Sequence, residues 1–208
     1  MLGIDVTNPF FANLLSRQVA ANTNDYGAFV ESLYIELIRC FEKLEGNANQ
    51  HVKKDETGIS SEVMMFLEGA RYRCSTETNS NGHVDLTVEE GSFKWLGEAK
   101  IHKGNEWTFH GFEQLVMNYS TGRPNACHGA IIVYNTKKKK SSLTCAEEWR
   151  EYIEGTPLNV TCSEYKPDGY FDMVLPKHIR SGAPYYIRNF FVTLHYTPSA
   201  KIGKKPKS

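Results

Sequence analysis

Hydrophobic residues recur every three or four positions in four parts of the chain, which is the spacing of an amphipathic helix. These segments cover residues 25–45, 60–70, 106–120 and 144–155. The polar stretch 45–58, rich in Gly and Asn, is typical of a loop between the first two helices.

Capping residues support the ends of two of these helices. Asn24 or Asp25 can cap the first helix, and Thr144 with Glu147 has the spacing of a capping box for the last. Gly155 follows as a natural stop.

Other segments change to the period of a strand. Residues 83–89 and 93–101 alternate between apolar and polar positions, and Gly91-Ser92 between them suits a two-residue type II′ hairpin turn. The continuous apolar run at 129–135 indicates a buried central strand. Two later segments also read as strands, 170–175 and 187–196.

The order of these elements predicts an α/β protein with a central mixed β-sheet flanked by helices. Internal repeats and long linkers are missing from the sequence, so we expect a single domain over residues 1–200. The basic segment 201–208 is expected to be a mobile tail.

Composition narrows the class of protein. With 40% hydrophobic and 23% charged residues, the 208-residue chain can build a core and does not read as disordered. It contains no apolar run near the ~20 residues of a membrane helix and no basic n-region of a signal peptide. Five scattered cysteines form no CxxC pair, which argues against a disulfide framework or a structural zinc site. We therefore expect a soluble protein of the reducing cytoplasm.

Charge is unevenly distributed although the formal net charge is zero. From position 137 onward there are 13 Lys and Arg against 7 Asp and Glu, whereas residues 1–136 carry 11 against 17. This asymmetry fits an acidic chemical centre beside a basic docking surface, or a solvated loop and tail.

Counting back from the Gly91-Ser92 turn predicts the cross-strand pairs of the hairpin. Paired residue numbers sum to 183, so Asp85 faces Glu98 and His83 faces Lys100 on one side. The other side is an apolar face, made of Val84, Leu86, Val88, Phe93, Trp95, Ala99 and Ile101.

Two facing carboxylates repel unless something neutralises them. A divalent cation would do so, and a few hard oxygen ligands suit Mg²⁺ or Mn²⁺. Lys100 could then orient an attacking water and offset charge on a phosphoryl transition state. Solvated ion pairs of Lys100 with Asp85 or Glu98 are the structural alternative. If the site is catalytic, Asp85→Ala is expected to be inactive yet at least as stable as the wild type without metal.

Asp85, twelve intervening residues and then Glu98-Ala99-Lys100 resemble the D…(D/E)xK signature of the PD-(D/E)xK nuclease superfamily. The resemblance extends over the order of elements in residues 59–135 and implies a restriction-endonuclease-like fold. It implies that Asp85 and Glu98 are metal ligands, helped by the Ala99 backbone carbonyl, and that Lys100 is the catalytic lysine.

The resemblance also implies supporting residues on the neighbouring helices. Glu62 best matches a glutamate that such enzymes often place near the metal, with Glu68 second, although a first-turn acid is also favoured by the helix dipole. Gln114 and Tyr119 look like a Gln and Tyr pair found after the motif, but their spacing is one residue longer than Q-x-x-x-Y. For Tyr119, packing with Val116 is the favoured alternative.

These features predict a metal-dependent phosphodiesterase, a DNA endonuclease in preference to an enzyme acting on RNA. Lys137, Lys138, Lys139 and Lys140 could contact phosphates without reading bases, or could be a solvated loop. Family analogy suggests a homodimer or a larger assembly with a regulatory subunit, acting in restriction or anti-phage defence. The alternatives are a catalytically inactive or partner-gated nucleic-acid-binding module of the same fold, or a protein-interaction subunit.

Overall fold

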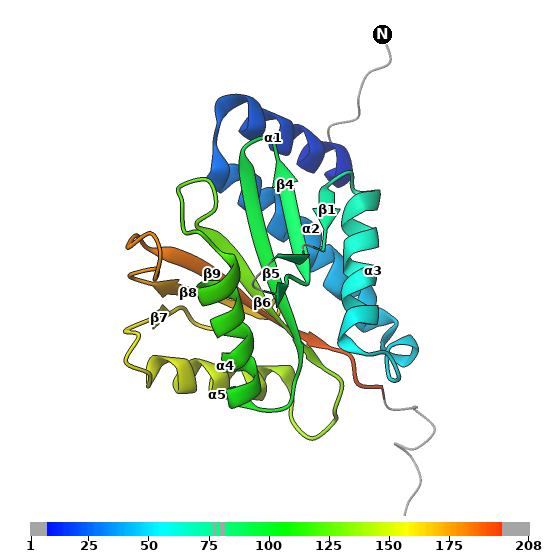
Figure 1. The fold of residues 1–208 in the computed structure, drawn as a ribbon. Helices are drawn as coiled ribbons and strands as arrows, with labels where there is room; N and C mark the ends of the chain where they lie inside the picture. Colours follow the sequence, from blue (N-terminus) through cyan, green and yellow to red (C-terminus); the bar gives the residue numbers. More distant parts are fainter. Residues whose placement is uncertain (1–7, 77, 80–81, 197–208) are drawn as a thin grey trace, which may run out of the picture.

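The computed structural model describes residues 8–76, 78–79 and 82–196, in which one sheet is covered by helices on both faces (Figure 1). The helices are α1 Pro9–Thr23, α2 Tyr26–Gly46, the 3₁₀ turn η1 Ala48–Gln50, α3 Glu56–Gly69, α4 Asn105–Glu113, the π-helical η2 Gln114–Tyr119 and α5 Ser142–Glu154. The strands are β1 Arg73–Ser75, β2 Thr78–Asn79, β3 Gly82–His83, β4 Leu86–Glu90, β5 Phe93–Ile101, β6 His128–Asn135, β7 Thr161–Cys162, β8 Tyr170–Leu175 and β9 Tyr185–Thr193.

Seven strands form a mixed sheet in the order β1-β4-β5-β6-β9-β8-β7. β5, β6 and β9 run parallel to one another, and the remaining pairs are antiparallel. β2 and β3 form a separate two-stranded sheet. The α/β class and the central mixed sheet are confirmed.

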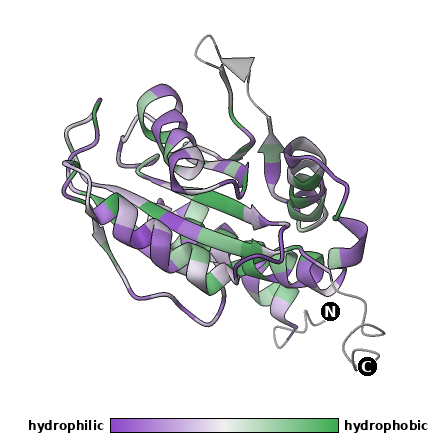
Figure 2. Ribbon diagram, turned by 90° about the horizontal axis from the view of Figure 1, so that it is seen from below, coloured by the Kyte–Doolittle hydropathy of each residue, from purple (hydrophilic) through white to green (hydrophobic). Residues whose placement is uncertain are grey.

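Each face of the sheet has its own hydrophobic core. One core lies between the sheet and α2 and α3, and the other lies between the opposite face and α4, η2 and α5. In Figure 1, α2 lies behind the sheet and α4 in front of it. Figure 2 shows hydrophobic residues along the central strands, whereas the outer faces of the helices are hydrophilic. Burial on both faces explains why 129–135, now β6, reads as a continuous apolar run.

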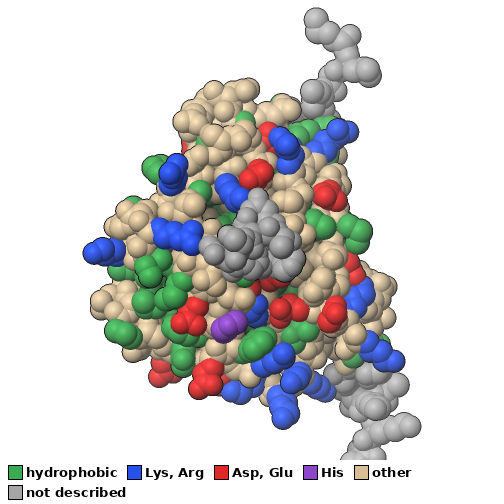
Figure 3. Space-filling model, viewed as in Figure 1, with side chains coloured by type: hydrophobic (Ala, Val, Ile, Leu, Met, Phe, Trp, Pro, Cys, Tyr) green, Lys and Arg blue, Asp and Glu red, His purple; other side chains and the backbone are tan. Residues whose placement is uncertain are grey.

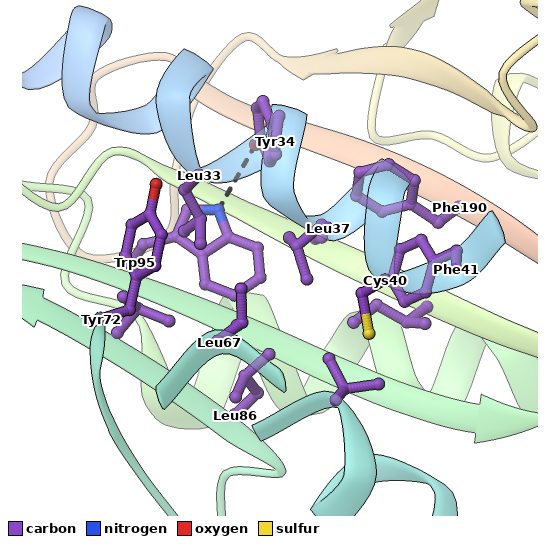
Figure 4. Packing of buried hydrophobic residues seen from close by; sticks show 14 of the residues in the cluster. Leu33, Tyr34, Leu37, Cys40, Phe41, Leu67, Tyr72, Leu86, Trp95 and Phe190 are labelled. Atoms are coloured by element: carbon purple, nitrogen blue, oxygen red, sulfur yellow. Dashed lines mark hydrogen bonds between the residues drawn. The ribbon is translucent and has the colours of Figure 1, made fainter. Parts of the chain in front are cut away.

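α2 supplies one side of the first core through residues spaced at helical intervals. Leu33, Leu37 and Phe41 point from α2 toward the strands, with Phe41 against Phe190 of β9 (Figure 4). Trp95 of β5 donates a hydrogen bond through Nε1 to the Tyr34 hydroxyl at 3.4 Å. The prediction of this helix is confirmed, and Asp25 is its N-cap, accepting a hydrogen bond from the backbone of the first turn.

Two helix starts differ from those that the sequence predicts. α3 begins at Glu56, four residues before Ser60, because the Asp55 side chain accepts the Gly58 N–H and caps the helix. α5 begins at Ser142, because Ser141, not Thr144, is the N-cap. Both caps lie in polar stretches where hydrophobic periodicity has not yet begun.

The sequence does not predict α1, which packs on α2. The buried residues of this helix are Asn13, Arg17 and only one apolar residue, Ala20, whereas Phe11, Leu15 and Val19 are exposed. Its hydrophobic pattern therefore points the wrong way for a core helix, and tertiary contacts hold it instead. Asn13 donates to a buried backbone carbonyl of α2 at 2.8 Å.

Within the described residues, every helix is too short or too polar to cross a lipid bilayer. The expected mobile tail, residues 201–208, lies outside the described part of the chain.

Candidate active site

The hairpin of β4 and β5 pairs in the register that the Gly91-Ser92 turn predicts. Leu86 lies opposite Gly97 and Glu90 lies opposite Phe93, so paired numbers sum to 183. Gly91 has a φ of 59°, the left-handed value that a type II′ turn needs at its first central position. The turn and the register are confirmed over this range.

The pairing stops at Leu86, and two expectations beyond that point are wrong. The backbone of His83 pairs with Thr78 in the two-stranded sheet, so it is not the cross-strand partner of Lys100. Val84 packs in the core beneath α4, not with the apolar face of the hairpin. The β4–β5 pairing ends at Leu86 opposite Gly97, so His83 and Val84 lie beyond the range over which the turn sets the register.

Beyond Gly97, β5 no longer pairs with β4, and two carboxylates accept the backbone N–H groups on that side of β5 instead. Asp85 Oδ2 accepts the Ala99 N–H at 2.9 Å. Glu56 Oε2, in the first turn of α3, accepts the Ile101 N–H at 2.7 Å. The N–H and C=O of one strand residue point to the same edge, so the Ala99 carbonyl faces the side where Asp85 lies.

Glu98 and Lys100 lie on the face of β5 that α4 covers, and they are only 1% and 5% exposed. Lys100 Nζ donates to Glu98 Oε1 at 2.5 Å and lies 3.7 Å from Glu56 Oε1. α4 approaches here at Gly111, where an added Cβ would lie 3.0 Å from Lys100 Cγ. A glycine at this position leaves room for the lysine side chain.

The electrostatics of the pair follow from burial. Burial, and then the charge of Asp85, raise the pKa of the Glu98 carboxyl to about 8, although Lys100 opposes the shift. Burial by itself would lower the pKa of Lys100, but the Glu98 carboxylate raises it above its usual value. The repulsion between Asp85 and Glu98 that the register predicts is therefore present in the folded chain.

An unpaired oxygen in this site fits a hard cation. Glu98 Oε2 is buried and has no hydrogen-bond partner among the described residues. Within the same residues, no group of three or more His, Cys, Asp and Glu side chains is placed to hold a metal ion. The chain would therefore offer the Asp85 and Glu98 carboxylates and the Ala99 carbonyl, and leave other positions to water and substrate. Mg²⁺ is commonly bound in this way, through one or two carboxylates.

The helix glutamate that reaches this site is Glu56 and not Glu62. Glu62 pairs with Lys54 and lies 3.4 Å from Nδ1 of the buried His51, between α2 and α3. Glu56 was missed because hydrophobic periodicity places the start of α3 later. The signal that could have found it was the capping residue Asp55 immediately before it.

A π-helical turn explains the long spacing between Gln114 and Tyr119. In η2 the backbone hydrogen bonds join residues five apart, not four, so side chains five apart come close on the same side of the helix. Gln114 Nε2 donates to the Tyr119 hydroxyl at 3.4 Å, and Gln114 Oε1 is buried without a partner among the described residues. Burial, and then the charge of Glu98, raise the pKa of Tyr119, which places its phenol within electrostatic reach of the site. Tyr119 also packs in the same core as Val116.

The four lysines 137–140 lie in the exposed turn between β6 and α5. Lys140 Nζ is paired with both carboxylate oxygens of Glu148, at 2.6 and 2.7 Å. Figure 3, in the view of Figure 1, shows Lys and Arg side chains along the lower edge, where this turn lies. The turn follows the end of β6, the parallel neighbour of β5, so its lysines lie at the carboxyl ends of the two strands, on the side of the sheet's rim toward which Lys100 and Ile101 lead.

Comparison of the chain with protein-family models, with curated proteins and with solved structures found no match in any of the three. The chemistry of Asp85, Glu98 and Lys100 therefore has to carry the functional assignment.

The raised pKa of Glu98 predicts a pH-dependent stability. A folded chain that holds this proton more tightly than the unfolded chain loses stability as pH rises between the two pKa values. In EDTA, the Tm of Glu98→Gln relative to the wild type is expected to rise from about pH 5 to about pH 8. Thermal unfolding across this range checks it, with Glu89→Gln on the neighbouring strand as the matched control. A pH-independent Tm difference for Glu98→Gln would contradict the prediction.

Proposed function

We propose that this protein is a metal-dependent nuclease that hydrolyses phosphodiester bonds, and specifically a DNA endonuclease. One observation carries the proposal. A buried carboxylate oxygen of Glu98, without a hydrogen-bond partner in the described part of the chain, lies in a site that also holds Asp85 and the Lys100 ammonium. Burying two carboxylates and an ammonium group this close together lowers the stability of the folded chain. The same three groups are suited to phosphoryl transfer, in which negative charge develops and must be stabilised.

The arrangement of elements supports a restriction-endonuclease-like fold. The hairpin β4–β5 bears the D…(D/E)xK motif, α4 covers it, and β6 then pairs with β5 in parallel at the centre of the sheet. This is the order that the resemblance to the PD-(D/E)xK superfamily implies.

Each residue has a role that its contacts suit. Asp85, Glu98 and the Ala99 carbonyl would hold Mg²⁺ or Mn²⁺, which supplies a Lewis acid and a water of lowered pKa. Lys100 would orient the attacking water and stabilise negative charge on the phosphoryl group. Glu56 is a positioning residue, because it binds the Ile101 N–H and lies beside the Lys100 ammonium.

The substrate and setting follow from the same proposal. Lys137, Lys138 and Lys139 would contact phosphates without reading bases, whereas Lys140 is engaged by Glu148. By analogy with the superfamily, the protein would act on DNA in the cytoplasm, as a homodimer or with a regulatory subunit, in restriction or anti-phage defence.

The second candidate is a nucleic-acid-binding module of the same fold without turnover. The observation that favours it is the closed ion-pair network, in which Lys100 lies between Glu98 and Glu56. The effect of Mg²⁺ on Tm distinguishes the two candidates. Mg²⁺ raises the Tm of a protein with an intact metal site, and it leaves unchanged the Tm of a protein in which the same residues form only structural ion pairs.

Cleavage of supercoiled plasmid in Mg²⁺ or Mn²⁺ tests the proposal, with Glu56→Gln and Glu62→Gln as a matched pair from one helix. Wild type is expected to nick or linearise the plasmid. Glu56→Gln is expected to lose about 10- to 100-fold in rate, as for residues that orient catalytic groups. Glu62→Gln is expected to cleave like the wild type, because its contacts are with Lys54 and His51.

The result that would overturn the nuclease is the absence of cleavage together with no rise of Tm in Mg²⁺. Equal losses in Glu56→Gln and Glu62→Gln would contradict the assignment of Glu56 to the site.

A further inference from the structure

Trp107 differs from the other two tryptophans of the chain. Trp95 and Trp149 are 0% and 1% exposed, whereas Trp107, in the first turn of α4, is 38% exposed. A single exposed aromatic side chain is common, so its neighbours decide whether it has a role.

Trp107 contacts a cation and a second ring, and its indole remains partly open to solvent. Lys103 Nζ lies 4.4 Å from the centroid of the indole. The His110 ring is stacked on the indole with centroids 5.8 Å apart and an interplanar angle of 18°. This group combines an aromatic surface with a positive charge at the solvent boundary.

The same face of α4 leads from Trp107 to the candidate active site. Trp107, His110 and Gln114 are three and four residues apart, so they form one line along the helix, about 10 Å long. Gly111, beside this line, is the residue that packs on Lys100 and Glu98. The acidic residues of α4 lie on the flank beyond His110, with Glu106 about 100° and Glu113 about 120° around the helix from Trp107.

The inner end of this line has an unsatisfied polar atom. Gln114 Oε1 is buried without a partner among the described residues, although its Nε2 is bound to Tyr119. A buried carbonyl oxygen of this kind can accept a hydrogen bond from a ligand amino group.

We propose that this face of α4 binds a single-stranded stretch of nucleic acid, with an unpaired base stacked on Trp107 and the strand running past Gln114 to Lys100. The inference rests on the proposed nuclease function and specifies its substrate class. A base inside a duplex has both faces covered by its neighbours, so only an unpaired base can stack on an exposed indole. Lys103 then pairs with a phosphate of the same strand.

Tryptophan fluorescence tests the proposal directly, because Trp95 and Trp149 are buried and changes on binding report on Trp107. The titration uses the full chain, a short oligothymidylate and a blunt duplex of equal length, all in EDTA to prevent cleavage. Oligothymidylate is expected to quench the fluorescence and the duplex is not. Trp107→Ala is expected to bind the oligonucleotide about 10-fold more weakly, while Trp107→Phe retains most of the affinity.

Three results would overturn the inference: unchanged fluorescence with oligothymidylate, equal affinity of Trp107→Ala, or tighter binding of the duplex. Plasmid cleavage in Mg²⁺ is measured in parallel on the wild type and Trp107→Ala. Cleavage without strand binding at Trp107 rejects only this inference. Strand binding without metal-dependent cleavage or metal stabilisation rejects the nuclease instead and leaves a binding protein.

Discussion

Lys100→Met is expected to lower the rate of plasmid cleavage by about 100- to 1000-fold, the usual loss when a donor to a transition-state charge is removed. Methionine keeps an unbranched side chain of similar length against Gly111, so the packing of α4 is retained. The ammonium that contacts Glu98 is lost, and with it the means of orienting a water. Rates of nicking of supercoiled plasmid in excess Mg²⁺ measure the effect.

Lys94→Met is the matched control, since Lys94 lies on the same strand and its ion pair with Glu89 is partly exposed. It is expected to cleave at close to the wild-type rate. Equal activity of Lys100→Met and the wild type would point to a contaminating nuclease or to a different site. Near-UV circular dichroism of both variants shows whether any loss comes from misfolding instead of chemistry.

Asp85→Asn is expected to lose at least about 100-fold in cleavage while remaining as stable as the wild type in EDTA. The asparagine oxygen can still accept the Ala99 N–H, and the substitution removes the charge that repels Glu98. The variant is also expected to lose most of the Tm increase that Mg²⁺ gives the wild type. Thermal unfolding with EDTA and with Mg²⁺, together with the cleavage rate, measures all three effects.

Asp85→Ala is the informative comparison, because it removes the charge and the hydrogen-bond acceptor together. The structure revises the expectation that this variant is at least as stable as the wild type without metal. Leaving the Ala99 N–H unpaired costs about 1–3 kcal/mol, so Asp85→Ala is expected to be less stable than Asp85→Asn. If Asp85→Asn and the wild type gained the same Tm from Mg²⁺, Asp85 would be a structural cap and not a metal ligand.

Local patterns in the sequence are sufficient to predict the hairpin that carries the site. Alternation over 93–101 reproduces β5, and the Gly91-Ser92 turn yields the register of β4 against β5, since a two-residue loop allows only one pairing. The same reasoning fails at His83 and Val84, because nothing in an alternating pattern marks the point at which a strand leaves its partner.

Tertiary contacts decide which other residues reach the hairpin, and no local pattern in the sequence predicts those contacts. Glu56 reaches Lys100 and Ile101 because the Asp55 cap starts α3 early and α3 packs beside the open edge of β5. The Gln114–Tyr119 contact requires a π-helical turn, which the spacing of the two residues suggests but cannot establish.

The sequence by itself determined the α/β class, the hairpin register and the sharing of one small region by Asp85, Glu98 and Lys100, because these follow from periodicity and turn chemistry within about 20 residues. Tertiary structure alone decided that Glu56 replaces Glu62, that Glu98 Oε2 is buried with no partner among the residues described, and that α1 turns Phe11 outward. Burial and long-range hydrogen bonds depend on which segments pack against one another. Hydrophobic periodicity predicts only that a segment has a buried face, and not which segment covers that face.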